Sequence, residues 1–192
     1  MMWPWEHLLV AYGLYSLTTN VLLRRSPSAG ETIAVVVASQ LPDLVDKPLA
    51  WTYGVTETGY AIGHSAFVAP LACLATLVAA DRYGDRVLAG AFSLAYGSHL
   101  VTDVFNPMRS GRPPEPRVLL WPLASPPTGD HGGLFDHFVV YFVRYANQPL
   151  AGGLSAAVAL QLAAGFSIVA LWLVDGAPVV SDCLRFVRDR LR

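Results

Sequence analysis

Residues 150–174 form a long apolar run that contains no charged side chain. A helix needs about 20 consecutive apolar residues to cross the hydrocarbon core of a bilayer, so this run is long enough. The whole chain supports the same interpretation, because 54% of its 192 residues are hydrophobic and only 14% are charged, against about 25% in soluble domains. We therefore expect a helical protein whose solvent is largely lipid.

Four earlier segments repeat the apolar pattern. Residues 5–23, 60–80 and 87–105 each have the length of a membrane helix. Residues 31–46 are shorter and more polar, and Pro42 is expected to end or bend this helix, which we expect to be shielded by its neighbours. The sequence thus predicts an all-α fold, a polytopic membrane helix bundle of about four to five membrane helices.

The remaining residues are expected to lie at the edges of this bundle. Residues 106–133 form a long loop rich in proline and glycine, and residues 134–145 have the apolar spacing of an amphipathic interfacial helix. A basic tail at residues 176–192 carries four arginines that suit an anionic lipid surface. Because no internal repeat is found, residues 1–192 are expected to form a single membrane-embedded domain.

The basic residues predict the orientation of the bundle. With five crossings, eight of the thirteen basic residues fall on the side of the C-terminus and five fall on the other side. Positive side chains favour the cytoplasmic face, so the N-terminus is expected outside and the C-terminus inside the cell membrane. No basic region precedes the first apolar segment, so we expect it to be retained and not cleaved as a signal.

Charge and cysteine usage argue against other classes of protein. The net charge is -1, which gives no support to a nucleic-acid partner. Cys73 and Cys183 are isolated, so neither a cysteine zinc site nor a disulfide framework is indicated. Membrane lipid is the partner that the composition favours, and the sequence leaves the oligomeric state open.

Alternating helix directions bring the histidines and several aspartates to one membrane face. His99 and Asp103 are four residues apart in one predicted helix, so they share a face and are able to hold one ion. Asp43 and Asp46 are three residues apart, and two close carboxylates repel unless a cation or a proton lies between them. The residues expected at this face are His7, Asp43, Asp46, His64, His99, Asp103, His131 and His137.

Each of these residues also has a simpler interpretation. His7 alone would be an interfacial hydrogen-bonding residue. Leu-Pro-Asp at 41–43 would only mark the end of a helix, with Asp46 paired to Lys47 or an arginine. His99 and Asp103 would be a hydrogen-bonded pair that joins helices, and the two loop histidines would reflect loop polarity. Ionisable residues in membrane segments are costly and tend to be functional. One shared site therefore explains their common location better than several independent causes.

A series of short motifs, taken in order, resembles the predicted membrane-bound metal-dependent hydrolases of the YdjM type. The motifs are His7, Leu-Pro-Asp-Leu-Val-Asp at 41–46, Gly-His-Ser at 63–65 and Gly-Ser-His-Leu-Val-Thr-Asp at 97–103. Trp-Pro-Leu at 121–123 also resembles the segment that follows the His-x-x-x-Asp helix in that family. Each motif is short, so the specificity of the resemblance comes from their order and spacing.

That family is in turn similar to zinc-dependent phospholipase C, an all-helical enzyme that holds zinc with histidine and aspartate. The resemblance implies that Asp46 is a further ligand or the general base. The other metal ligands that it implies are His7, Asp43, His64, His99 and Asp103. The second His-x-x-x-Glu pair of the phospholipases is absent, and membrane spans stand where those enzymes have soluble helices. The resemblance therefore supports the metal site more strongly than the reaction.

These observations predict a metal-dependent hydrolase, with a non-catalytic membrane protein as the alternative. Mixed imidazole and carboxylate ligands suit zinc, or else manganese or iron, and such a metal activates a water for attack on a phosphoester. A site at headgroup level favours a lipid-linked phosphoester, whose phosphate Arg109, Arg112 and Arg117 would hold unless they are simply solvated. In the alternative, the site fixes helix packing, binds metal without catalysis or supports a complex. A cavity containing Arg112 and His131 would favour the enzyme.

Overall fold

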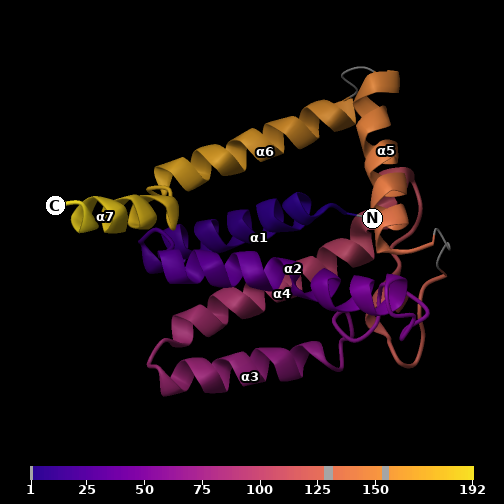
Figure 1. Cartoon of the computed structure of the whole chain (residues 1–192), viewed down its shortest axis with the longest axis horizontal. Coiled ribbons are helices and arrows are strands. Elements are labelled where there is room, and N and C mark those ends of the chain that lie inside the picture. The colour runs from indigo at the N-terminus through magenta and orange to yellow at the C-terminus, as the bar shows by residue number, and fades with distance from the viewer. Residues whose placement is uncertain (1, 128–131, 153–155) are drawn as a thin grey trace.

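The computed structural model describes residues 2–127, 132–152 and 156–192, and helices joined by loops make up this part of the chain, with no strand in it (Figure 1). The helices are α1 (Pro4–Thr18), α2 (Ala29–Trp51), α3 (Ala69–Arg82), α4 (Arg86–Phe105), α5 (Leu134–Gly152), α6 (Ala156–Val174) and α7 (Val180–Arg190). α2 and α4 pack together at the centre, α1 packs against both, and α3 packs along α4. The predicted all-α fold class is confirmed.

Small side chains let the three central helices approach closely. Ala11 of α1, Ala34 and Ala38 of α2, and Ala91 and Ala95 of α4 are buried in one core cluster. Small residues at helix–helix contacts allow the backbones to come together. This close approach brings the polar residues of α2 and α4 within reach of one another.

Local signals fix where the central helices begin. α2 follows Ser28, whose hydroxyl accepts from the Glu31 N–H at 3.3 Å while the Glu31 carboxylate accepts from the Ser28 N–H at 3.1 Å. This reciprocal pair satisfies donors that a helix N-terminus leaves open. α4 follows Asp85, whose carboxylate accepts from the Leu88 N–H, and the helix predicted at 87–105 is confirmed.

Pro42 does not end α2, so the structure excludes the first of the two outcomes, an end or a bend, that the sequence predicts. The helix continues through Pro42 and Pro48 to Trp51, although a proline inside a helix removes one backbone hydrogen bond and costs about 3 kcal/mol. Pro42 is fully buried, and its backbone lies directly against Gly63 of the next loop. Tertiary packing therefore offsets the local cost, and the two aspartates of this segment lie within the helix.

The third predicted segment is shorter than expected. α3 begins only at Ala69, and residues 52–68 form an irregular loop that contains His64. The physical cause is the carboxylate of Asp46, which accepts backbone N–H groups from three residues of this loop. Those bonds hold the loop in a path that a helix would not follow.

The membrane-spanning helices predicted from the sequence are not found. Over the described residues, no helix combines the length and the apolar character needed to cross a membrane. Two of the predicted spans are cut short as α-helices, because α1 has 15 residues and α3 has 14.

The amphipathic segment predicted at 134–145 is helical and forms most of α5. α5 crosses one end of the molecule, at an angle to the other helices (Figure 1). Phe135, Phe138 and Phe142 on this helix are each about half exposed or more. One side of α5 is therefore apolar and only partly covered, since Trp3 packs edge-on against Phe138 and Phe142.

α6 returns along α1 and is tied to it at its C-terminal end (Figure 1). The Asp175 carboxylate accepts hydrogen bonds from the hydroxyls of Tyr12 at 2.7 Å and Ser16 at 2.6 Å, and from the Asn20 amide at 2.9 Å. α7 then projects beyond the body of the molecule at the end opposite to α5.

Candidate metal centre

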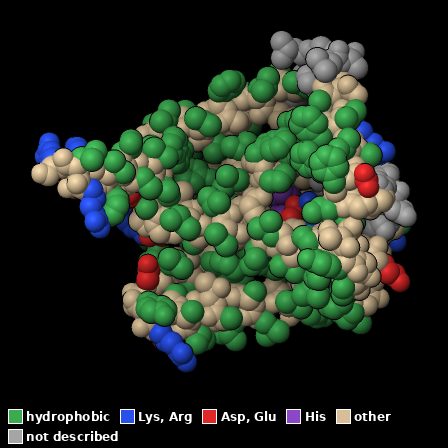
Figure 2. Space-filling model, in the orientation of Figure 1, with side chains coloured by type: hydrophobic (Ala, Val, Ile, Leu, Met, Phe, Trp, Pro, Cys, Tyr) green, Lys and Arg blue, Asp and Glu red, His purple; other side chains and the backbone are tan. Residues whose placement is uncertain are grey.

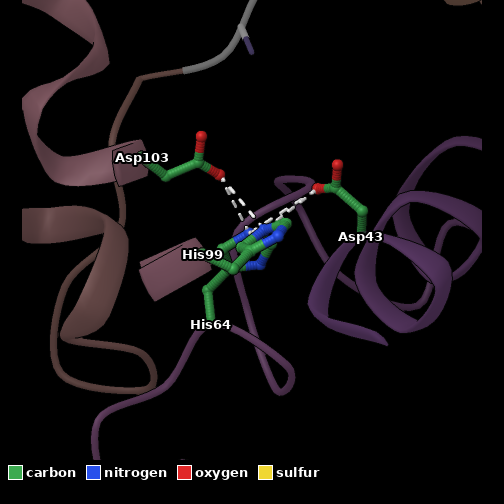
Figure 3. A group of neighbouring side chains, drawn as sticks. All are labelled: Asp43, His64, His99 and Asp103. Atoms are coloured by element: carbon green, nitrogen blue, oxygen red, sulfur yellow. Dashed lines mark hydrogen bonds and ion pairs between the residues drawn. The ribbon is translucent and has the colours of Figure 1, made fainter. Parts of the chain in front are cut away.

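Four buried side chains from three segments converge on one point (Figure 3). Asp43 comes from α2, His64 from the loop after α2, and His99 and Asp103 from α4. Each offers one ligand atom, and these atoms all lie within 4.8 Å of one another. The structure thus brings together most of the residues that the sequence predicts as metal ligands.

The spacing of these atoms suits a small cation. His64 Nε2 lies 3.1 Å from His99 Nε2 and 3.2 Å from Asp103 Oδ2, and His99 Nε2 lies 3.5 Å from the same oxygen. Asp43 Oδ1 is 3.6 Å from His64 Nε2 and 3.8 Å from His99 Nε2. Ligands about 2.0–2.2 Å from a tetrahedral zinc ion are separated by about 3.3–3.6 Å, which is close to this arrangement.

The proton on each imidazole is fixed by the partner of its Nδ1. His99 Nδ1–H donates to the backbone carbonyl of Ser39 at 2.6 Å, and a carbonyl is able only to accept. His64 Nδ1–H donates to the Asp46 carboxylate at 2.8 Å. In the neutral form that binds a metal, each imidazole would carry its single proton on Nδ1, so both Nε2 atoms would present lone pairs to the shared space. Histidines that bind metal ions are held in this way.

The ligand group contains two carboxylate oxygens without matching donors in the described chain, one facing the shared space and one facing His7. Asp43 Oδ1 and Asp103 Oδ1 are buried and lack a hydrogen-bond partner in the part of the chain that the structure describes. Buried polar atoms are nearly always paired, and close carboxylates repel without a cation. An added proton or a metal ion therefore has to balance the group, and four converging nitrogen and oxygen donors fit a divalent metal such as zinc, manganese or iron.

His7 of α1 lies against this group without being one of the four. Its Nδ1 lies 3.1 Å from the Thr102 hydroxyl, which donates to the His99 carbonyl and so accepts from His7. His7 Nε2 is buried 3.5 Å from Asp103 Oδ1 and has no hydrogen-bond partner among the described residues. The His7 ring stacks on His99 with centroids 3.8 Å apart. Its metal-binding role stays a prediction, and this geometry suits it.

Asp46 contacts the Nδ1 edge of His64. Its Oδ1 accepts from the Gly63 N–H at 2.8 Å, and its Oδ2 accepts from the N–H groups of Ala61 at 2.7 Å and His64 at 3.0 Å as well as from the imidazole. Asp46 is not one of the four converging ligands. Its contacts are those of a carboxylate that orients a metal-binding histidine, whereas the sequence suggested a ligand or a general base.

The loop that carries His64 is locked on both sides. A Cβ at Gly63 would lie 2.8 Å from both the Cα and the carbonyl oxygen of Pro42, so only glycine fits this close approach. The Ser65 hydroxyl donates to the Trp121 carbonyl at 2.7 Å. The motifs that the sequence could only place in order are therefore joined in space around His64.

A cavity of about 350 Å³ lies beside the metal-ligand group and shares Asp103 with it. Its wall contains residues from α2, the following loop, the long loop and α5, among them Lys47, Tyr60, Arg112, Glu115 and His137. Lys47 is buried and donates a hydrogen bond to Asp43, one turn earlier in α2. The spacing of four residues between Asp43 and Lys47 is the sequence signal for this pair, whereas Asp46 is the partner of Lys47 considered above.

The three loop arginines have different surroundings. Arg112 lines the cavity, whereas Arg109 pairs with Glu6 at 2.9 Å and Arg117 with Glu115 at 2.6 Å. Hydrogen bonds from Arg117 lower the pKa of the Glu115 carboxyl. Only Arg112 among these three is therefore placed to meet a ligand in the cavity.

The two loop histidines have separate outcomes. His137 is buried in the cavity wall, where its ring stacks on Trp51 with centroids 4.2 Å apart. His131 lies outside the described residues. The structure thus adds an aromatic pair to the cavity and leaves the predicted role of His131 untested.

Comparison with known protein families gives a match over residues 1–177 to the family described as YdjM inner membrane protein. The chain belongs to this family. YdjM membership supports a membrane location and agrees with the resemblance seen in the motifs. No curated protein and no solved structure matches the chain.

Proposed function

We propose that this YdjM-family protein is a membrane-bound metal-dependent hydrolase that acts on a phosphoester, either lipid-linked or part of a lipid headgroup. One observation carries the proposal: the converging ligand group of Asp43, His64, His99 and Asp103 lies at the edge of a cavity, and Asp103 belongs to both. A group bound in that cavity would lie next to the metal, as hydrolysis requires.

The chain's own residues would prepare the site before a substrate arrives. Asp43, His64, His99 and Asp103 would hold one divalent metal, zinc by preference. Such a metal lowers the pKa of a bound water and stabilises negative charge on a phosphoryl oxygen. Asp46 orients His64, and Lys47 holds Asp43 through Oδ2 while Oδ1 stays without a partner in the described chain.

Asp46 and His7 are the two residues considered as the proton acceptor. Asp46, the base suggested by the sequence, already accepts four N–H groups. His7 Nε2 is buried beside Asp103 with no partner among the described residues, so it suits either a fifth ligand or the proton acceptor. Metal content of His7→Gln separates the two roles, because loss of a base leaves the metal in place.

The first test is metal content, measured by mass spectrometry on detergent-purified protein. The wild type is compared with the His99→Ala/Asp103→Ala double variant and with His137→Ala, which removes a cavity histidine outside the ligand group. We expect near-stoichiometric zinc, manganese or iron in the wild type and in His137→Ala, and its loss in the folded double variant. Absence of metal from the wild type after loading at neutral pH would sink the proposal.

The same ligand group also supports a non-catalytic alternative. Four protein ligands are enough to close a tetrahedral zinc site, and closed sites are usually structural. In that case the metal would fix α2, α4 and the loop between α2 and α3, and the protein would serve as a structural or metal-binding subunit of a complex. A screen of phosphoester substrates with metal-loaded protein distinguishes the two, since a structural site supports folding without turnover.

The exposed apolar surface supports our proposal that the helices form a multi-pass bundle in the membrane. Leu17, Leu22, Leu74, Leu160 and Phe166 are all more than half exposed, and hydrophobic side chains cover much of the face in Figure 2. Water is a poor solvent for so much apolar surface. The polar side chains of the candidate site are buried inside, as lipid surroundings require.

We propose that α7 lies at the cytoplasmic surface and the metal centre near the extracytoplasmic face. Val180, Leu184 and Val187 share one side of α7 and are exposed, and arginines of the same helix gather at that end of the molecule (Figure 2). Such a helix suits an anionic leaflet. Cys183 on α7 is exposed, so in a Cys73→Ser background a membrane-impermeant maleimide should label it only after the cells are permeabilised. Labelling of intact cells would reverse the proposed orientation.

A further inference from the structure

Two cations in the cavity wall, Lys47 and Arg112, keep N–H donors that no carboxylate of the described chain accepts. Lys47 is 9% exposed, and its ammonium group donates to Asp43 and lies 5.9 Å from the centre of the Trp51 ring. It therefore lies between the ligand group and the cavity. Because the lysine is held at Asp43 Oδ2, its remaining N–H donors are available to a ligand in the cavity.

Arg112 supplies the second cation from the long loop. Its Nε donates to the Ser110 hydroxyl at 3.2 Å, while its two terminal nitrogens make no hydrogen bond or ion pair within the described residues. Glu115, the nearby carboxylate in the wall, is taken by two hydrogen bonds from Arg117. The guanidinium of Arg112 thus keeps the planar pair of donors that binds a phosphate.

The charge of this region becomes more positive when the metal binds. Without metal, the carboxylates of Asp43 and Asp103 lie beside Lys47 and repel an anion. A divalent ion would neutralise these carboxylates, and charges in a partly enclosed site are screened less than at the surface. The cavity should therefore attract an anion only when the metal is present.

The volume of the cavity limits the size of the group to which this anion is attached. The cavity holds about 350 Å³, which is enough for a headgroup-sized ligand and too little for acyl chains as well. Several prolines of the long loop line it, namely Pro107, Pro113, Pro114, Pro126 and Pro127. Proline restricts the backbone, so this wall is formed before the ligand arrives.

We infer that Lys47 and Arg112 form a phosphate-binding subsite beside the metal centre, and that the substrate is a phosphoester whose phosphate and small polar group enter the cavity while any acyl chain stays outside. This inference rests on the proposed function, because the subsite needs the metal charge. It makes Lys47 and Arg112 residues that determine specificity for phosphate.

The test uses inorganic phosphate and purified full-length protein that carries only tightly bound metal. Equilibrium dialysis with labelled phosphate is run on the wild type, Lys47→Met, Arg112→Gln and the control Arg82→Gln, an exposed arginine of α3 outside the cavity. Loss of a charged hydrogen bond weakens binding by about 10-fold or more. We expect that loss in Lys47→Met and Arg112→Gln, unchanged binding in Arg82→Gln, and no binding to metal-free wild type.

Metal content of every sample separates this inference from the proposed function. Lys47→Met also frees Asp43, so Arg112→Gln, which contacts none of the four ligands, is the decisive variant. Metal bound with no phosphate binding, or equal binding by Arg112→Gln and Arg82→Gln, overturns the subsite and leaves the metal centre standing. No metal in the wild type overturns both. Displacement of phosphate by dihexanoyl phosphatidic acid at lower concentrations than glycerol phosphate assigns a lipid source; equal displacement assigns a soluble one.

Discussion

Replacing Gly63 with alanine should disturb the metal centre without touching any ligand. The added Cβ would lie 2.8 Å from the Cα and the carbonyl oxygen of Pro42, whereas carbon atoms in contact are about 3.5–4.0 Å apart. Both neighbours are backbone atoms of α2 at the buried Pro42, so the loop has to move by about 0.7–1.2 Å. His64 is the next residue, and metal–ligand distances tolerate only about 0.2 Å.

Two quantities follow from this displacement. Overpacking of this kind costs about 1–3 kcal/mol, which corresponds to a decrease of a few degrees in the thermal midpoint for a chain of this size. Metal affinity should fall about 10–100-fold, as it does when the support of a ligand is disturbed. Affinity is measured by competition with a chromophoric chelator, and stability by thermal unfolding in detergent.

Gly90→Ala is the matched control because it makes the same chemical change inside α4, where no atom lies within 4 Å of the added Cβ. This variant should bind metal normally and gain about 0.5–1 kcal/mol in stability from the better helix former. If Gly63→Ala bound metal as tightly and melted at the same temperature as Gly90→Ala, the close approach of the loop to Pro42 would not be what positions His64.

Three further variants test other contacts. Asp46→Asn should reduce metal affinity about 10–100-fold while the chain still folds; unchanged affinity in the chelator assay would exclude a positioning role. Asp175→Ala removes the acceptor that joins the end of α6 to α1 and should lower the free energy of unfolding by about 1.5–3 kcal/mol, with no effect on metal content. Ser65→Ala leaves the Trp121 carbonyl without its 2.7 Å donor and should cost about 1–2 kcal/mol; an unaltered midpoint would show that this link is dispensable.

The convergence of these side chains was predictable because helical spacing and helix direction can be inferred from the sequence. His99 and Asp103, four residues apart, share a face in the structure as expected. Asp43 and His64 also reach the same point, although Asp43 lies in mid-helix and His64 lies in a loop. Convergence depends on which end of the bundle each residue occupies and not on the exact helix boundaries, so it holds although those boundaries differ from the predicted ones.

Other features depended on partners that are distant in the chain. The sequence predicts Asp46 as a ligand or base, and it does not indicate the backbone N–H groups, from a loop at least 15 residues away, that this carboxylate accepts in the structure. Arg109 and Arg117 were grouped with Arg112, yet each finds a carboxylate and leaves Arg112 alone at the cavity. Competition between possible partners is decided by distance, which composition and spacing do not contain.

The sequence by itself determined the helical class, the apolar character and the set of residues able to bind a metal, because these follow from side-chain chemistry and from the 3.6-residue period of a helix. Only the tertiary structure decided which atoms converge. α2 continues past Pro42, a residue that favours a helix end, because Pro42 is buried against Gly63. The hydrogen bonds to Ser39 and Asp46 orient the imidazoles of His99 and His64. Both outcomes depend on contacts between segments far apart in the chain, whose energies exceed the local preferences that the sequence displays.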